Sequence, residues 1–193
     1  SVLSNFKEKW GMARANFNGV TRKAFIYLMG AWLIIAGFVY YNTQILNTYK
    51  NKDELEKIRV DYEKTYKKYE DYSLPVLTDI KYHIDIFPYR RNVYVKAEAV
   101  YKNKGSQAID SLFFNIDEKW NPKITIPNSE RVLNDEHIGF QIYKLNKPLQ
   151  PGETMQLRME TSYISRGFEN TAGNTSILKN GTFLNNMEIL PIM

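Results

Sequence analysis

Residues Ala24–Tyr41 have the sequence AFIYLMGAWLIIAGFVYY, and the rest of the chain is organised around them. These eighteen residues carry no charge, and the uncharged run extends to Tyr49. About 20 mostly apolar residues cross the hydrocarbon core of a bilayer as a helix, which satisfies every backbone polar group internally. We therefore predict a transmembrane helix over residues 23–49. The alternative, a helix buried in a soluble core, is disfavoured because such helices rarely lack polar residues over five turns.

Composition limits the classes of function. Residues 1–75 hold 12 Lys and Arg against 8 Asp and Glu, whereas residues 76–193 hold 14 against 13. The part of the chain after residue 75 is therefore near neutral and lacks the basic footprint of a nucleic-acid-binding domain. The chain has no cysteine, which excludes disulfides, thiolate metal sites and thiol catalysis. The chain starts at Ser1 and stops at Met193 inside an apolar run, so we expect it to be a fragment of a longer protein.

Residues 1–22 form a basic amphipathic segment before the span. One face of a short helix is predicted by apolar residues at spacings of three and four, namely Leu3, Phe6, Trp10, Ala13 and Phe17. Such a helix beside a span commonly lies in the membrane interface. A core helix of a larger membrane domain is an equal alternative. A cleaved signal peptide is disfavoured by the length of the apolar run and by the absence of small residues after it.

The orientation of the span rests on a weak charge bias. Arg22 and Lys23 adjoin its first end, whereas the first cation beyond its second end is Lys50. Over a wider window each side carries five basic residues. The positive-inside rule, which counts Lys and Arg only, therefore leans toward a cytoplasmic N-terminal side.

Residues 50–75 are predicted to form a charged helical stalk. A narrow apolar stripe runs along it, consisting of Leu55, Ile58, Tyr62, Tyr66 and Tyr69. Asp53 is the predicted N-terminal cap, and Pro75 ends the helix. Ion pairs four residues apart contribute only a few tenths of a kcal/mol each, so we expect the Tyr stripe to pack on another element.

Residues 76–193 are predicted to be a β domain. Apolar residues alternate with polar ones over 80–86 and 93–101, and further strands are expected around Ile109–Ile116, near Ile124, at Gly139–Leu145 and at Met155–Tyr163. Pro151-Gly152 marks a turn, and the tail after Ser165 is predicted to be loop. The expected fold class is mainly β, an antiparallel β-sandwich or saddle domain preceded by one transmembrane helix and a charged helical stalk.

Catalytic and metal-binding motifs are absent from the sequence. The two histidines, His83 and His137, lack carboxylates at metal-ligand spacing, and His83 falls on the polar face of a strand, where we expect it to be exposed to solvent. HExxH, Walker and nucleophile-elbow patterns do not occur. We therefore predict no catalytic residue, no metal ligand and no cofactor within this chain.

Three segments resemble M1-family zinc aminopeptidases. In Pro75–Ile116, Tyr82–Ile86 matches Y-x-I-D-I and Val95–Asn103 matches V-x-A-x-x-x-Y-x-N. Leu149–Leu157 matches L-x-P-G-E-T-x-x-L, and the closing NGTFLNNMEILPIM resembles the approach to the catalytic domain. The span and stalk are similar to a bacterial subgroup in which an ABC-2-type permease region precedes a periplasmic M1 peptidase region.

The resemblance implies a location and a role rather than a site. The exopeptidase signature and the zinc-binding HExxH with its downstream Glu would lie beyond Met193, so no functional residue is carried over. The implied role is a non-catalytic β domain that buttresses a zinc metallopeptidase domain of the same parent chain, at the periplasmic face of a bacterial inner membrane. ABC-transporter-type subunits are implied as further partners, and zinc is expected only in the parent.

Two other hypotheses remain open. The first is a membrane-anchored β-sandwich that docks a partner in an envelope or ABC-type transport complex. It predicts that aromatic side chains cluster on one exposed face, from the set Phe113, Phe114, Trp120 and Phe140. The second is a purely structural cap of a permease. Sandwiches host many functions, so the fold class alone does not separate the hypotheses.

Overall fold

The computed structural model describes residues 5–47, 49–169, 176–185 and 189–193. The chain divides into two compact units: one holds Ser1–Tyr49 with Arg166–Asn170, and the other holds Lys50–Ser165 with Thr171–Met193. Among the described residues, 37% lie in strands and 33% in helices, so the fold is mixed, with antiparallel sheets and one apolar N-terminal helix. The helix content exceeds a mainly β fold because the span and the stalk are both long helices.

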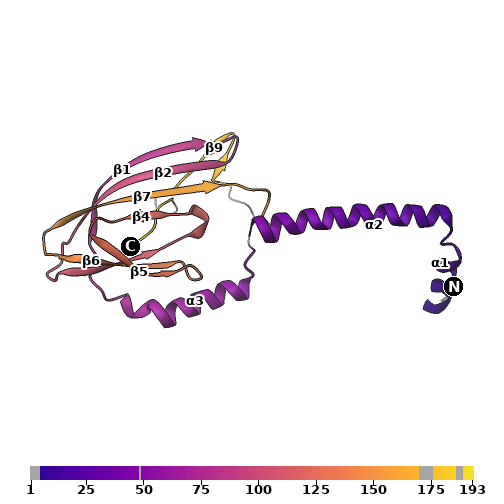
Figure 1. Cartoon of the computed structure of the whole chain (residues 1–193), viewed down its shortest axis with the longest axis horizontal. Coiled ribbons are helices and arrows are strands. Elements are labelled where there is room, and N and C mark those ends of the chain that lie inside the picture. The colour runs from indigo at the N-terminus through magenta and orange to yellow at the C-terminus, as the bar shows by residue number, and fades with distance from the viewer. Residues whose placement is uncertain (1–4, 48, 170–175, 186–188) are drawn as a thin grey trace. The chain divides into compact units, whose positions relative to one another are not determined.

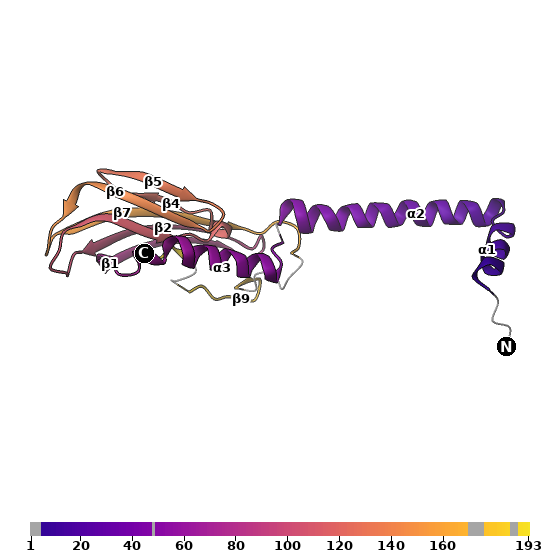
Figure 2. The same cartoon turned by 90° about the horizontal axis from the view of Figure 1, so that it is seen from below.

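The first unit is helical. It contains α1 (Phe6–Ala15), α2 (Gly19–Tyr40) and a π-helical turn, η1 (Tyr41–Leu46). α2 and η1 form one continuous helical rod (Figure 2). α2 begins at Gly19, before the predicted boundary at residue 23. Asn18 has an extended conformation and separates α1 from α2, so the second helix starts directly after it. Leu3, the first residue of the predicted stripe, lies outside the described residues.

The described part of the second unit contains two larger antiparallel sheets. Sheet A has the strand order β1-β2-β7-β4, and sheet B has the order β3-β6-β5. The strands are β1 (Val76–Phe87), β2 (Asn92–Lys102), β3 (Ile109–Asn115), β4 (Lys123–Thr125), β5 (Ser129–Asp135), β6 (Phe140–Leu149) and β7 (Thr154–Ile164). Every predicted strand is present. β5 was not predicted, since its sequence is rich in polar residues and a register shift between Arg131 and Leu133 interrupts its alternation.

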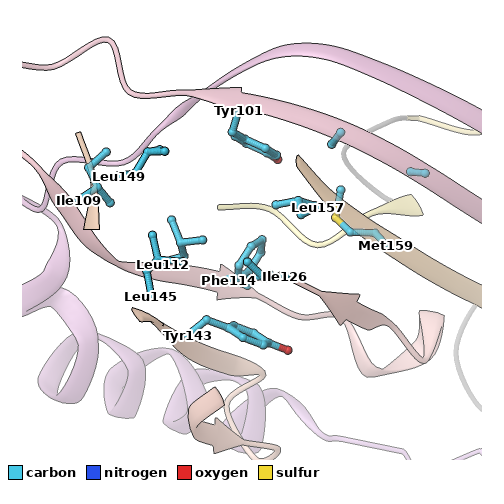
Figure 3. Packing of buried hydrophobic residues seen from close by; sticks show 12 residues of the cluster. Tyr101, Ile109, Leu112, Phe114, Ile126, Tyr143, Leu145, Leu149, Leu157 and Met159 are labelled. Atoms are coloured by element: carbon cyan, nitrogen blue, oxygen red, sulfur yellow. The ribbon is translucent and has the colours of Figure 1, made fainter. Parts of the chain in front are cut away.

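The two sheets share one apolar core. Inward side chains of β2 and β7, including Tyr101, Leu157 and Met159, face those of β3 and β6, including Leu112 and Phe114 (Figure 3). In β2 and β7 of sheet A, alternation along the strand places these residues on one face and polar or charged residues on the other. On the outer face of sheet A, Glu98 pairs with Arg158 across neighbouring strands, with 3.2 Å between Oε1 and Nε.

Sheet B is buried on both faces. Its second face packs against α3 (Lys52–Tyr66) and the 3₁₀ turn η2 (Lys67–Tyr69), which lie beside β5 and β6 (Figure 1). In β3, Leu112 and Phe114 point into the core between the sheets, whereas Phe113 points to the helix. The predicted support of the Tyr stripe is therefore confirmed, and residues 50–75 belong to the same compact unit as the sheets.

The N-terminal cap of α3 differs from the prediction. Asn51, rather than Asp53, accepts a hydrogen bond from the Glu54 N–H, and Glu54 in turn accepts one from the Asn51 N–H. Asn51 and Asp53 both have Glu three residues later, so either could form this reciprocal capping box. The cap at Asn51 leaves Asp53 in the first turn, where a negative charge favours the helix dipole.

Two expectations about the β domain need correction. β1 is an edge strand, and of its alternating apolar residues only Ile80 and Tyr82 are half-buried, while Ile84 and Ile86 are exposed. The tail after Ser165 is not all loop, since it contains the hairpin β8 (Ile177–Leu178) and β9 (Gly181–Thr182). Its apolar side chains complete a second core cluster against Val93, Val95, Trp120 and Tyr163.

Candidate functional site: an apolar span and an aromatic groove

The residues that the structure describes contain no cluster of side chains that resembles a catalytic or metal site. No group of three or more His, Cys, Asp or Glu side chains there could hold a metal ion. His83, whose side chain is 75% exposed on the outer face of sheet A, as predicted, has its Nε2 3.6 Å from Asp85 Oδ2. His137 lies elsewhere, in the turn between β5 and β6.

The surface of α2 is apolar and uncovered. Gly19–Leu46 is a helical stretch of 28 residues that is long and apolar enough to span a membrane, and none of its most apolar window is buried within the chain. The 22 residues of α2 alone extend about 33 Å, slightly more than the hydrocarbon thickness of about 30 Å. Large side chains such as Trp32, Leu33 and Ile34 are exposed around its circumference. A surface of this kind needs an apolar surrounding.

Polar side chains close the C-terminal end of the span. In η1, Asn42 Nδ2 donates to the Phe38 carbonyl at 2.8 Å, and Thr43 Oγ1 donates to the Val39 carbonyl at 2.9 Å. Helix ends leave carbonyls without partners, which is costly at the edge of an apolar phase. Asn47 Nδ2 donates to the carbonyl of Asn42, in the last helical turn, at 3.0 Å, whereas the bonds of Asn42 and Thr43 go to carbonyls four residues earlier in the same helix.

A short loop far away in sequence completes this end. Asn47 Nδ2 also donates to the carbonyls of Arg166 (2.7 Å) and Phe168 (3.2 Å), and the Phe168 ring lies 5.8 Å from that of Phe38. Gly167 has a φ of +56°, and a Cβ there would overlap the Asn42 side-chain oxygen. Only glycine allows this close approach without strain. The loop and the helix end therefore form a clamp, defined here as Asn42, Asn47 and Arg166–Phe168.

In the second unit, an aromatic groove lies between α3 and sheet B. Phe140 is central to it: its ring lies 4.2 Å from that of Tyr66, in a stacked arrangement, and 5.9 Å from that of Tyr62. Tyr69 stacks on Phe113 at 4.7 Å. Such ring pairs contribute about 0.5–1.5 kcal/mol beyond their burial. The groove has a volume of about 370 Å³, and its rim carries charged side chains from α3 and the following turns.

A partly buried hydrogen bond fixes α3 over the groove. The Tyr66 hydroxyl donates to Asp135 Oδ2 at 2.7 Å, while Asp135 Oδ1 accepts from the N–H groups of His137 and Ile138, both at 3.1 Å. Burial, followed by the bond to Asp135, raises the pKa of Tyr66 to about 12. The same bond, with those from the two backbone N–H groups, lowers the pKa of Asp135. Both shifts favour a neutral phenol and an ionised carboxylate at neutral pH.

The burial of these aromatics settles one hypothesis about function. Phe113, Phe114, Trp120 and Phe140 are all buried, so the expectation that they form an exposed docking face is wrong. Phe113 and Phe114 are consecutive in β3 and therefore point to opposite faces of the sheet, and both faces are covered. Phe113 and Phe140 thus hold the helix to sheet B, while Phe114 and Trp120 belong to the other two core clusters.

A buried asparagine joins two of the matched segments. Asn103 is fully buried at the end of β2; its Nδ2 donates to the carbonyls of Gln107 (2.7 Å) and Leu149 (2.9 Å), and its Oδ1 accepts from the Gly105 N–H (2.9 Å). Its backbone N–H donates to the Glu153 carbonyl, and its carbonyl accepts from the Gly152 N–H. The Y-x-N segment and the PGET turn therefore meet at this one residue.

Comparison of the chain with models of protein families, with curated proteins and with solved structures gave no match. Functional assignment consequently rests on the sequence and on the geometry described above. Sequence reasoning identified the span and the Tyr stripe, but it missed the clamp and the role of Asn103. The one sequence signal for the latter is the position of Asn103 at the start of the segment Asn103-Lys104-Gly105-Ser106, whose residues are typical of a turn.

Proposed function

We propose that this chain is the membrane-tethered, non-catalytic N-terminal β domain of an M1-aminopeptidase-like membrane protein. In this proposal α2 crosses a bacterial inner membrane, the N-terminal side is cytoplasmic, and the β domain is periplasmic. The observation that carries the tether is the apolar surface of α2, whose most apolar window is not buried anywhere in the described part of the chain. A soluble helix of this length would normally bury one face.

The polar clamp at the end of α2 supports the same assignment. A helix that leaves the hydrocarbon region must satisfy its last carbonyls locally, because lipid offers no hydrogen bonds. Asn47 Nδ2 supplies such a bond to the carbonyl of Asn42, which lies in the last helical turn. Tyr40 and Tyr41 lie at the same end, at a depth that suits amphipathic rings.

The tether is tested by extraction of membranes with alkaline carbonate. The full chain should stay in the pellet, and Ile34→Asp with Ile35→Asp should move it to the supernatant. Two carboxylates at the centre of a span cost roughly 6 kcal/mol of insertion free energy. The matched control is Val132→Asp with Phe183→Asp, which places the same charges at exposed positions of the second unit. Release of the unmodified chain by carbonate would refute the tether.

The orientation is tested with single cysteines, since the chain has none of its own. Lys50→Cys and Asn16→Cys stand on opposite sides of α2 and are both exposed. In intact spheroplasts, an impermeant maleimide should label Lys50→Cys and spare Asn16→Cys until the membrane is opened. The reverse pattern would place the β domain in the cytoplasm and remove the periplasmic assignment.

The link to a peptidase is supported by the matched segments. Their convergence at Asn103 offers a physical reason for the recurrence of Y-x-N with PGET, because each turn uses hydrogen bonds to the other. The test is to read the gene beyond the codon for Met193. An HExxH followed by a spaced Glu would make this chain the anchored front of a zinc metallopeptidase. A stop codon soon after Met193 would refute the peptidase part and leave the tether intact.

The proposal includes partners other than the parent chain only because the span and stalk resemble the subgroup with an ABC-2-type permease region. ABC-transporter-type subunits would be expected if the span is the last one of a permease region. Co-purification of such subunits from solubilised membranes is the corresponding measurement.

A further inference from the structure

α1 carries an aromatic stripe that no other described segment covers. Phe6 is 78% exposed and Trp10 65%, and their rings stack on each other with centroids 6.4 Å apart. Ala13 continues the same face, because residues three and four apart lie one above the other on a helix. No described residue of α1 is buried.

Cations flank this stripe on both sides. At 100° per residue, Lys9 falls about 60° to one side of Phe6, and Lys7 and Arg14 fall about 80–100° to the other side. Glu8, the single acid of the helix, lies on the opposite face. Lys and Arg in such flanking positions can lay their methylene stems along an apolar phase and keep their charges at its polar boundary.

The stripe continues toward the start of the span. Phe17, which follows α1, makes an edge-to-face contact with Phe25 of α2, with ring centroids 5.5 Å apart. Arg22 and Lys23 add two further cations at this end of α2. The aromatic side chains thus lead into the apolar surface of α2, and the cations gather where that surface begins.

We infer that α1 lies in the headgroup region of an anionic lipid leaflet, with Phe6 and Trp10 at the acyl boundary and Lys7, Lys9 and Arg14 on anionic headgroups. This inference rests on the proposed function, since it requires α2 to span that bilayer. The charge pattern selects the occupant: an aromatic stripe alone would suit a neutral membrane or a protein groove, whereas cations along both edges complement a negative lipid surface. The inference adds a lipid preference to the tether.

The test uses the full chain in lipid nanodiscs with a nitroxide on a single introduced cysteine. Ala13→Cys places the label on the stripe, and Ala15→Cys places it on the opposite face as the matched position. Two nanodisc compositions are compared, phosphatidylcholine alone and phosphatidylcholine with about one quarter phosphatidylglycerol. The measurement is the collision rate of the label with a water-soluble nickel chelate and with oxygen.

We expect the label at residue 13 to be shielded from nickel in anionic nanodiscs, and the label at residue 15 to be accessible in both. In neutral nanodiscs the shielding at residue 13 should fall. Each cation near an anionic surface changes the bound population roughly fivefold, so Lys7→Gln, Lys9→Gln and Arg14→Gln together should reduce it about 100-fold. The control is Lys104→Gln, Lys123→Gln and Lys144→Gln, three exposed lysines of the second unit.

Three outcomes would overturn the inference. If residue 13 is as accessible as residue 15 in both compositions, α1 does not lie on the membrane. If residue 13 is shielded equally in both and the charge variants have no effect, either an apolar surface alone or a protein partner holds it. If the chain fails to enter nanodiscs, as judged by gel filtration, the tether itself falls, which separates this failure from the other two.

Discussion

Asn103 offers the sharpest test of the packing in the β domain. Its side chain makes three hydrogen bonds to backbone groups on two turns, and its exposed fraction is 0%. Asn103→Ala deletes all three bonds and retains the two bonds from the Asn103 backbone. At a net value of about 1 kcal/mol for each bond, the free energy of unfolding should fall by about 3 kcal/mol.

Asn103→Asp separates hydrogen bonding from size. One carboxylate oxygen can still accept from the Gly105 N–H, but the other replaces Nδ2 and faces the carbonyl oxygens of Gln107 and Leu149. Burial and these two dipoles disfavour the ionised form, so the pKa of this Asp should rise above its unfolded value of about 3.9. A raised carboxyl pKa destabilises the folded state as pH rises. The deficit of Asn103→Asp should therefore be larger at pH 8 than at pH 4.5, while that of Asn103→Ala stays constant.

The assay is urea unfolding of the full chain in detergent micelles, followed by tryptophan fluorescence. Trp10→Phe and Trp32→Phe, both in the first unit, leave buried Trp120 as the single reporter of the β domain. If Asn103→Asp is no less stable than Asn103→Ala at pH 8, or if its deficit does not change with pH, the assigned hydrogen bonds are wrong.

Three further predictions concern the groove and the clamp. Phe140→Ala empties the centre of the aromatic cluster and should lower the free energy of unfolding by about 3–5 kcal/mol in the same assay; a loss below 1 kcal/mol would contradict its burial. Tyr66→Phe should lower the free energy of unfolding by about 1.5–3 kcal/mol at pH 7. Because the pKa of Asp135 is lowered in the folded state, this loss should shrink as pH falls below about 4. A loss that does not change with pH would count against the hydrogen bond. Gly167→Ala should speed amide exchange over residues 42–47, whereas Gly181→Ala, which has open space at its Cβ, should not; equal exchange in both variants would argue against the clamp.

Local periodicity explains why most of the fold was predictable. The strands β1, β2 and β7 alternate in hydrophobicity, and α3 carries its Tyr stripe at helical spacing, so both signals are contained within windows of about ten residues. The strand that was not predicted, β5, lacks this alternation. It is held in the sheet by its pairing with β6, which includes a register shift between Arg131 and Leu133. The misassigned cap of α3 reflects two equivalent capping patterns two residues apart.

The contacts that define the candidate sites were not predictable in the same way. Tyr66 and Asp135 are 69 residues apart, and Asn47 and Phe168 are 121 apart. Nothing in the local sequence of Asp135 distinguishes it from a solvated loop carboxylate. The buried aromatics were misjudged for the same reason, because the sequence does not show that sheet B is covered on both faces.

The sequence alone determined that an uncharged helix of membrane-spanning length precedes a region of antiparallel strands, because length, charge and periodicity are local properties of the chain. The tertiary structure alone decided which faces are covered, so that Phe113 and Phe140 support α3, Asn103 joins two turns, and the loop at Gly167 closes the end of α2. Burial and hydrogen-bond satisfaction depend on partners that are distant in sequence, and folding alone brings those partners together.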